Sequence, residues 1–245
     1  MARVHQHVAD LSLDAPVLIE GLPGVGLVGK IATDHLIDSF DMRHVASCVA
    51  DGLPDVAVYH ADSPDVLAPV RIYADESRDL LALQSDVPVS PDDAGGFAAA
   101  LTDWLGARDA FPLYLSGLPA ELDDRPDCFG IACGDAAPVL EEHGIDRPGH
   151  GGLVSGPTGA LLSEAARREF DALGLVVEAN RQFPDPEAAR VLLVDAVEPV
   201  AGIDVDTDVL TEQADEIAAA RQELAASLGQ GDQDASQAQP LGMFH

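Results

Sequence analysis

Three glycines near the amino terminus have the spacing of a nucleotide-binding loop. Gly24, Gly26 and Gly29 fit G-x-G-x-x-G, and they lie between an apolar run typical of a strand and a helical pattern. In the dinucleotide fingerprint, amides at such a helix start bind a pyrophosphate, and an acid about 20 residues later binds the ribose. Asp51 stands at that distance. The spacing therefore favours a nucleotide site as one interpretation of the loop Gly21–Lys30.

The same loop has two other interpretations. Gly24 to Lys30 fits the G-x-x-x-x-G-K of a P-loop, but the next residue is Ile31, so the hydroxyl that would bind magnesium is missing. Alternatively, glycines at a strand-to-helix turn allow one backbone segment to pass close to another. In that case Gly21 and the other glycines of the loop are structural.

The last three residues form a second candidate site, with a different chemistry. Residues 229–242 before them are rich in Gln, Asp, Ser and Gly, and cannot bury enough apolar surface to fold. Met243 and Phe244 then place an apolar and an aromatic side chain next to the free carboxylate of His245. Such an end suits a partner whose pocket binds the side chains while fixed donors bind the carboxylate. A frayed terminus is the alternative.

Other chemically capable residues lack partners. His5 and His7 have metal-like spacing, and a strand would place both on one face, but the sequence indicates no further ligands, so we expect no metal site. No general base is assignable to Ser116 or Ser155. His143 lies before a glycine-rich loop at 147–158 and His150 lies within it, and both are expected to be exposed polar residues. The segment from Gly149 to Gly159 is a candidate to line a pocket together with the first glycine loop. The three cysteines are expected to be buried small hydrophobes: Cys48, Cys128 and Cys133.

The charge balance excludes some partners. The 245 residues include 43 acidic and 13 basic side chains, for a net charge of −30, and Lys30 is the single lysine. So acidic a surface is typical of an extreme halophile and needs salt to screen its self-repulsion. Nucleic acids and anionic membranes need a basic face, so neither is an expected partner. With no apolar leader or long apolar run, we expect a cytoplasmic protein.

Hydrophobic periodicity predicts alternating strands and helices for the body of the chain. The expected strands are 15–20, 44–50, 66–74, 80–84, 111–116, 128–133 and 174–179, with 66–74 and 80–84 forming a hairpin. The expected helices run from the glycine loop to about residue 40, and over 92–108, 135–143, 159–173 and 186–197, the last capped by Asp185. This alternation predicts an α/β fold with a mostly parallel central sheet covered on both faces.

The carboxyl-terminal part differs from this body. Apolar positions from Leu210 to Leu228 alternate in steps of four and three, which predicts a helix with a narrow apolar stripe. Such a stripe docks on its own body or on another subunit. We therefore expect an α/β domain over 1–205, a helix over 206–228 and a flexible tail over 229–245.

The run LIEGLPGVGLVGK at 18–30 resembles the opening signature of the archaeal proteasome assembly chaperone family. Three later segments are similar to the same family: Ser116-Gly117, 156–162 and 184–189. The resemblance covers residues 14–228. It implies a Rossmann-like three-layer α/β sandwich that forms homo-oligomers and has no established catalytic activity.

The resemblance also bears on the tail. Some family members carry a carboxyl-terminal hydrophobic-Tyr-any motif that docks between α subunits of the proteasome core particle. Met243 matches the first position and His245 the last, whereas Phe244 stands where Tyr is usual. This tail keeps the ring and the carboxylate but lacks the phenol hydroxyl.

The leading hypothesis is therefore a non-enzymatic proteasome assembly chaperone or activator that needs no cofactor. Met243, Phe244 and His245 would bind the α ring of the core particle, and a homo-oligomeric body would present several tails at once. The alternative is a nucleotide- or small-molecule-binding α/β protein, or an enzyme, that uses the loop Gly21–Lys30.

Overall fold

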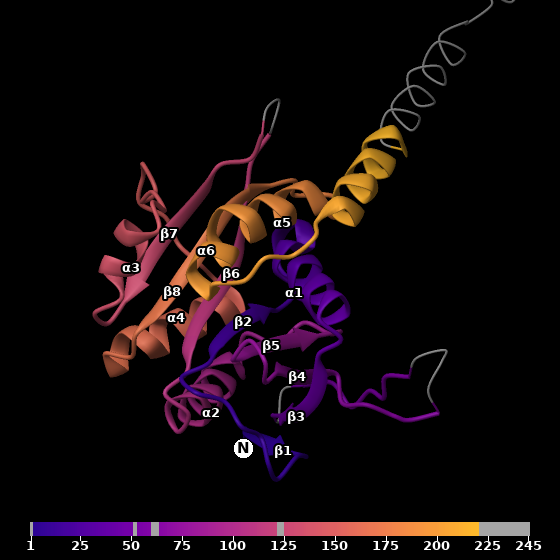
Figure 1. Ribbon diagram of the computed structural model, residues 1–245, viewed down its shortest axis with the longest axis vertical. Coiled ribbons are helices and arrows are strands. Elements are labelled where there is room, and N and C mark those ends of the chain that lie inside the picture. The colour runs from indigo at the N-terminus through magenta and orange to yellow at the C-terminus, as the bar shows by residue number, and fades with distance from the viewer. Residues whose placement is uncertain (1, 51–52, 60–63, 122–124, 221–245) are drawn as a thin grey trace, which may run out of the picture.

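A mixed eight-stranded sheet forms the centre of the protein (Figure 1). The computed structural model describes residues 2–50, 53–59, 64–121 and 125–220. Along the sheet the strands follow the order β1-β3-β4-β5-β2-β6-β8-β7. Their bounds are Arg3–Gln6 (β1), Val17–Gly21 (β2), Arg43–Val49 (β3), Val70–Asp75 (β4), Leu80–Ser85 (β5), Phe111–Pro119 (β6), Cys128–Cys133 (β7) and Ala172–Ala179 (β8).

The expectation of a mostly parallel sheet is wrong for the flanks. Parallel pairing is limited to the central strands β5, β2, β6 and β8. The outer pairings, β1 with β3, β3 with β4, β4 with β5 and β7 with β8, are antiparallel. For β4 and β5 the physical reason is the connection, because parallel neighbours need a long crossover and these two strands are joined by a tight turn. The predicted hairpin at 66–84 is confirmed as this β4–β5 pair.

Helices cover both faces of the sheet, as expected for a three-layer sandwich. On one face the core lies under α1 (Val28–Ser39), α3 (Ala137–Glu142), α5 (Pro186–Leu192), a π-helical turn (Leu193–Val197) and α6 (Glu198–Ala201). On the other face it lies under α2 (Ala94–Gly106) and α4 (Gly156–Arg168), which pack against each other. In Figure 1 the labelled α1, α5 and α6 lie in front of the sheet. Among the described residues, no helix has the length and apolar character to cross a membrane.

One predicted helix extends too far. The pattern of residues 162 to 173 indicated a helix through Leu173, but α4 begins at Gly156, ends at Arg168, and gives way to β8 at Ala172. Glu169 terminates the helix in the left-handed conformation, with φ 52°. That conformation usually requires Gly or Asn, so the sequence carries no stop signal at this position.

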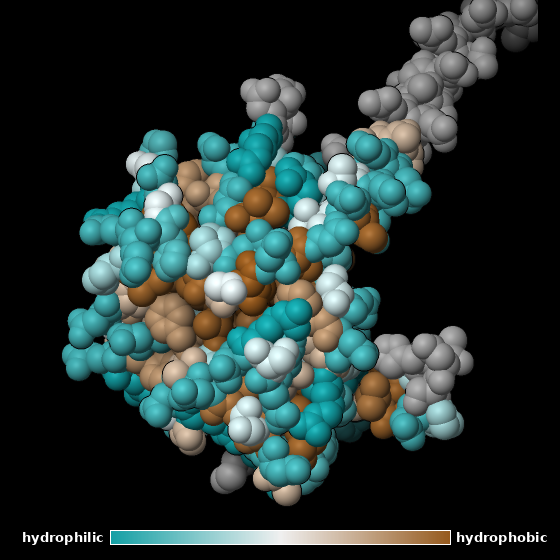
Figure 2. Space-filling view, in the orientation of Figure 1, coloured by the Kyte–Doolittle hydropathy of each residue, from teal (hydrophilic) through white to brown (hydrophobic). Residues whose placement is uncertain are grey.

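The carboxyl-terminal helix leaves the body almost at once. Residues 208–220 are helical, and of these only Leu210 is buried, in the core under α1. Ala214 and Ile217 continue the apolar stripe but are half-buried, and the residues around them are exposed. Figures 1 and 2 show this helix, in yellow in Figure 1, projecting from the body with mostly hydrophilic residues on its visible surface. Docking along its own body is therefore confined to the first turn.

Candidate functional site

The loop Gly21–Lys30 is in close contact with neighbouring chain segments. A Cβ atom on Gly21 would lie 2.3 Å from Thr33 Oγ1, and one on Gly117 would lie 2.4 Å from the carbonyl oxygen of Val25. Neither distance is compatible with a side chain. These two glycines allow the loop to pass directly over α1 on one side and β6 on the other.

The loop is also bonded to the start of α5. Gly26 has φ 62°, and its carbonyl oxygen accepts a 2.8 Å hydrogen bond from the amide of Asp185. The Asp185 carboxylate in turn accepts from the amides of Ala188 (3.0 Å) and Asn180 (2.8 Å). The predicted helix cap at Asp185 is confirmed, and the same residue joins the loop to β8 and α5.

Glu20 lies beneath this loop and has no exposed surface. Its carboxylate accepts hydrogen bonds from the amides of Leu22 (3.0 Å) and Leu115 (3.1 Å) and from the hydroxyl of Thr158 (3.1 Å). Burial raises the pKa of Glu20 to about 8, although these donors oppose the rise by favouring the charged form. Glu20 thereby connects β2 to β6 and to the start of α4.

The four segments that carry the family resemblance therefore meet in one place. We call this place the junction: the loop Gly21–Lys30, Gly117, Thr158 and Asp185, gathered over Glu20 at the carboxyl ends of β2, β6 and β8. Its contacts are between protein groups, and they account for Gly21, Gly26 and Gly117 by packing. Glu20 is buried away from solvent, so it is not placed to exchange protons with a ligand.

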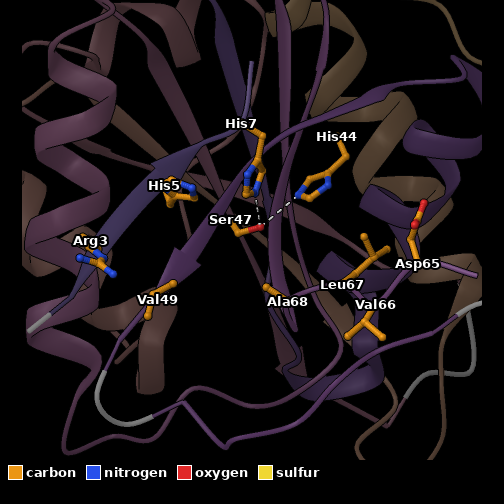
Figure 3. A pocket seen from close by; sticks show the side chains of 10 residues that line it. All are labelled: Arg3, His5, His7, His44, Ser47, Val49, Asp65, Val66, Leu67 and Ala68. Carbon is orange, nitrogen blue, oxygen red and sulfur yellow. Dashed lines mark hydrogen bonds between the residues drawn. The ribbon is translucent and has the colours of Figure 1, made fainter. Parts of the chain in front are cut away.

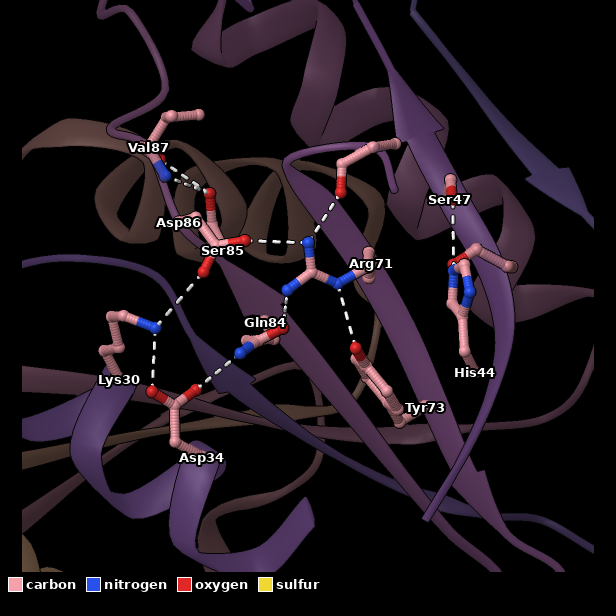
Figure 4. A network of polar contacts seen from close by, with 12 residues as sticks. Lys30, Asp34, His44, Ser47, Arg71, Tyr73, Gln84, Ser85, Asp86 and Val87 are labelled. Carbon is pink, nitrogen blue, oxygen red and sulfur yellow. Dashed lines mark hydrogen bonds and ion pairs between the residues drawn. The ribbon is translucent and has the colours of Figure 1, made fainter. Parts of the chain in front are cut away.

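Lys30 is occupied by carboxylates rather than directed at an anion site (Figure 4). Its Nζ lies 2.7 Å from Asp34 Oδ2 and 3.7 Å from Asp86 Oδ1. Asp86 also pairs with Arg71, at 2.7 Å, and the Arg71 side chain has no exposed surface. The remaining bonds of this network join Arg71 to Tyr73, Ala68 and Gln84, and Gln84 to Asp34. A phosphate would have to compete with two carboxylates for Lys30.

The strand order also departs from the dinucleotide fingerprint. Asp51 itself lies outside the described residues, but it follows β3, and β4 and β5 separate β3 from β2. At about 4.8 Å per strand the separation is roughly 14 Å. In the fingerprint the acid follows the strand next to the glycine loop. The spacing of Asp51 in the sequence is therefore not matched by adjacency in the sheet.

The serines and cysteines that the sequence offered as chemically capable residues form no site with one another. Ser116 is a half-buried residue of β6, and Ser155 is the exposed residue before α4. Cys48 and Cys133 are buried, as predicted, whereas Cys128 is only half-buried. Burial raises the pKa of both Cys48 and Cys128 to about 12, so neither thiol forms a reactive thiolate near neutral pH.

The glycine-rich loop at 148–154 lines a groove, but not with the first glycine loop as expected. Its lining comes from the loop itself, from β6, β7 and β8, and from Leu162 of α4. The groove is largely apolar, with a volume of about 480 Å³, and Leu153 beside it is 99% exposed.

A different pocket collects histidines. It has a volume of about 530 Å³ and lies at the β1 edge of the sheet (Figure 3). Arg3, His5 and His7 line it from β1 and the residue after it, and Ser47 and Val49 line it from β3. The antiparallel register sets Arg3 opposite Val49 and His5 opposite Ser47, so these side chains share one face of the sheet. The remaining lining residues are His44, Asp65, Val66, Leu67 and Ala68. We call this the histidine pocket.

A β-bulge brings His44 into this pocket. Residues 44 and 47 of a regular strand would point to opposite faces. The register between β3 and β4 shifts between His44 and Ala46, and the adjacent residues Val45 and Ala46 are both buried in the core under α2. The extra residue re-aims His44 toward the face that Ser47 occupies.

Ser47 connects the two histidines, which flank it in Figure 3. His44 Nε2 lies 3.0 Å from the carbonyl oxygen of Ala46, which only accepts, so this nitrogen carries a proton. The Ser47 hydroxyl lies 3.1 Å from His44 Nε2 and 2.8 Å from His7 Nε2. It therefore bridges the two rings, accepting from His44 and acting as donor or acceptor toward His7 according to the tautomer of that ring. Burial lowers the pKa of His44, and the neighbouring His7 and Arg71 lower it further.

Metal binding does not follow from this cluster. Across the described part of the chain, no group of three or more His, Cys, Asp or Glu residues is arranged to hold a metal ion. The Nε2 atoms of His7 and His44 both lie within hydrogen-bond distance of Ser47 Oγ, so the hydroxyl occupies the place where the two nitrogens converge.

Comparison with known proteins gives the junction a family context. Residues 18–225 match the PAC2 family. The chain belongs to the PAC2 family. An uncharacterized protein of Methanocaldococcus jannaschii is 28% identical over 219 residues, which are 89% of this chain and 88% of that protein.

Two solved structures share this PAC2 fold. The Pyrococcus furiosus protein PbaB, an archaeal proteasome activator, superimposes with a TM-score of 0.80 at 22% identity, covering 91% of this chain and 98% of that one. Pyrococcus furiosus PbaA, an archaeal homolog of proteasome-assembly chaperone, gives 0.77 at 23% identity, covering 95% and 96%.

Of the two predicted sites of this PAC2 protein, the structure describes the glycine loop but not the chain end. The junction glycines lie together and pack against protein groups, whereas Met243, Phe244 and His245 fall outside the described residues. Sequence reasoning found His5 and His7 but missed His44 and Ser47. No local signal connects β1 to β3, because their neighbourhood depends on strand pairing and on the bulge.

Proposed function

We propose that this PAC2 protein is a cytoplasmic, non-enzymatic proteasome assembly chaperone or activator that docks its carboxyl-terminal tail on the α ring of the core particle. Met243 and Phe244 fill an apolar cleft between subunits, and the carboxylate of His245 pairs with a basic residue of that cleft. PbaB and PbaA, whose folds this chain shares, are described as a proteasome activator and as an assembly-chaperone homolog.

The observation that carries the proposal is the course of the helix at 208–220. Only Leu210 anchors it, and the following ten residues lead away from the sheet (Figure 1). A helix advances about 1.5 Å per residue, so these ten residues displace the chain by roughly 15 Å. A further 25 residues follow and end in Met243, Phe244 and His245. Such a helix presents the chain end to a partner rather than to its own body.

Several copies strengthen the proposed contact. A three-residue end buries little surface and binds weakly alone, but linked ends gain effective concentration. A homo-oligomer of this chain therefore suits a ring-shaped partner with repeated clefts. The half-buried stripe at Ala214 and Ile217 offers an apolar surface for contact between copies.

The test is binding of the full chain to the cognate core particle in molar salt, with and without Met243–His245. We expect loss of binding on truncation and an unchanged oligomer mass by light scattering. Phe244→Ala should abolish binding, and Phe244→Tyr should strengthen it by restoring a hydroxyl. Leu241→Ala, two residues before Met243, is the matched control and should bind normally. Peptidase activity measured on the same samples separates an activator from a silent chaperone.

One added variant tests the role of the carboxylate. A glycine appended after His245 keeps every side chain but moves the charge by one residue, and we expect it to bind weakly. Full binding by the truncated protein would refute tail docking. Failure of the intact chain to bind would refute the partner itself.

A further inference from the structure

The histidine pocket has a basic side and an apolar side, as Figure 3 shows. Arg3, His5, His7 and His44 provide nitrogen donors on one side, and Val49, Val66, Leu67 and Ala68 provide the apolar side. Its volume of about 530 Å³ lies within the range of small-molecule sites, roughly 300–1,000 Å³. The lining includes one acidic residue, Asp65, which is engaged in an interaction of its own.

Within the described part of the chain, Arg3 and His5 are the donors of this pocket that remain available. The side chains of Arg3 and His5 make no ion pair or hydrogen bond with any described residue; His5 only packs edge-on against His7, with ring centroids 4.9 Å apart. His7 places Nε2 2.8 Å from Ser47 Oγ, and its Nδ1 makes no hydrogen bond with any described residue. By contrast, Arg71 beside the pocket is fully engaged with Asp86, Gln84 and other partners. In a chain with 43 acidic and 13 basic residues, this hollow thus gathers exposed donors that pair with no acidic side chain of the described part of the chain.

We propose that the histidine pocket binds an organic carboxylate that carries an apolar body. The carboxylate accepts hydrogen bonds from Arg3 and from the rings of His5 and His7, and the apolar body lies against Val66, Leu67 and their neighbours. Guanidinium and imidazolium donors form charge-assisted bonds to carboxylates, which are stronger than neutral ones. The role is separate from tail docking, because it uses only the body of the protein.

The geometry also links binding to protonation. Burial lowers the pKa of His44, and the charges of Arg71 and of His7 when it is protonated lower it further. A bound anion offsets those charges, so binding favours uptake of a proton by the cluster. The titratable and charged groups that face His44 come from three elements: Arg3, His5 and His7 from the β1 segment, Arg71 and Tyr73 from β4, and Asp65 from the loop before β4. Binding should therefore be tighter at pH 6 than at pH 8, with the rise in affinity setting in as the pH falls toward 6.5 and below.

The experiment is calorimetric titration of the full chain with phenylacetate at constant ionic strength, at pH 6 and pH 8. Acetate tests the apolar body, neutral phenylacetamide tests the charge, and inorganic phosphate tests a different anion. We expect phenylacetate to bind, acetate to bind more weakly and phenylacetamide to give no heat. The carboxylate could come from a small metabolite or from the carboxyl terminus of a peptide. A peptide ending in Met-Phe-His, tested as free acid and as amide, distinguishes these two sources.

Matched variants locate the binding. Arg3→Gln combined with His5→Asn should weaken phenylacetate binding by about tenfold or more, since two bonds to a charged group are lost. Arg181→Gln combined with His150→Asn removes an exposed arginine and an exposed histidine elsewhere, and should leave binding unchanged. Equal weakening by both pairs, equal binding of phenylacetamide or phosphate, or absence of carboxylate binding would each overturn the proposal.

Discussion

The junction and the helix at 208–220 use their side chains in opposite ways. At the junction, Glu20 is completely buried and its carboxylate accepts from three donors, while Gly21 and Gly117 leave no room for a Cβ atom. Along the helix only Leu210 is buried, and the rest of the apolar stripe stays at the surface. The junction therefore holds the chain together, whereas the helix beyond Leu210 leaves its apolar stripe unused by the body of the protein.

The four segments that carry the family resemblance belong to the packed part of this comparison. The segments that carry the resemblance are the ones that pack against each other, through Gly26 with Asp185 and Glu20 with Thr158. Those contacts account for the signature residues by packing. The projecting helix and the lining of the histidine pocket lie outside these four segments.

The largest expected effect is at Gly21. Gly21→Val places a branched side chain where even a Cβ would lie 2.3 Å from Thr33 Oγ1 and 2.8 Å from the carbonyl oxygen of Gly29. We expect a cost on the order of 5 kcal/mol, comparable with the whole free energy of unfolding of many domains. Denaturant unfolding followed by circular dichroism measures it.

Gly24→Ala is the matched control within the same loop. An added Cβ there meets no atom within 4 Å, and Gly24 has an ordinary φ of −146°. Its unfolding free energy should stay within about 0.5 kcal/mol of the parent. A stable Gly21→Val variant would contradict the packing role and would favour a ligand site at the loop Gly21–Lys30 instead.

A smaller effect, with a pH signature, is expected at Glu20. Because its pKa is raised to about 8 in the folded protein, the proton stabilises the fold. That stabilisation is complete below about pH 4.5 and is lost as the pH rises through about 8. Each tenfold difference in proton affinity between the folded and unfolded chain corresponds to about 1.4 kcal/mol. Glu20→Gln should therefore flatten the fall in unfolding free energy between pH 5 and pH 9, by a few kcal/mol.

The exposed Glu142 provides the control for this pH profile. Glu142→Gln removes the same charge from the surface and should leave the slope as it is in the parent protein. If Glu20→Gln kept the full slope, the carboxylate would be ionised in the fold, held by Leu22, Leu115 and Thr158.

Local sequence patterns predicted which segments form helices and strands, but they predicted less well which of these elements lie side by side. The periodicity of α1 and α2, the β4–β5 hairpin and the cap at Asp185 are each encoded within one short stretch of the chain, and the structure confirms them. The end of α4 at Glu169 was missed because a non-glycine residue adopts the left-handed conformation there. The strand order was missed because it depends on pairings between distant segments.

The candidate sites show the same limit. The glycine spacing from Gly24 to Gly29 was visible, but its meaning depended on Gly117 and Asp185, which no local pattern places beside it. His5 and His7 were visible as a pair, whereas His44 reaches them only through a bulge in β3. Spacing along the chain identifies residue types that suit a chemistry, and tertiary pairing decides whether they meet.

The smallest expected effect separates the two ends of the projecting helix. Leu210→Ala removes its buried anchor, which is 2% exposed, and should cost about 2 kcal/mol and speed proteolysis of residues 208–220. Ile217→Ala alters the same stripe two turns later, where the side chain is half-buried, and should change the unfolding free energy by less than about 0.5 kcal/mol. Light scattering gives the second readout: Ile217→Ala should lower the oligomer mass if the stripe joins copies of the chain. An unchanged mass with both variants would confine the helix to presenting the tail, because the stripe beyond Leu210 would then bind neither its own body nor a second copy.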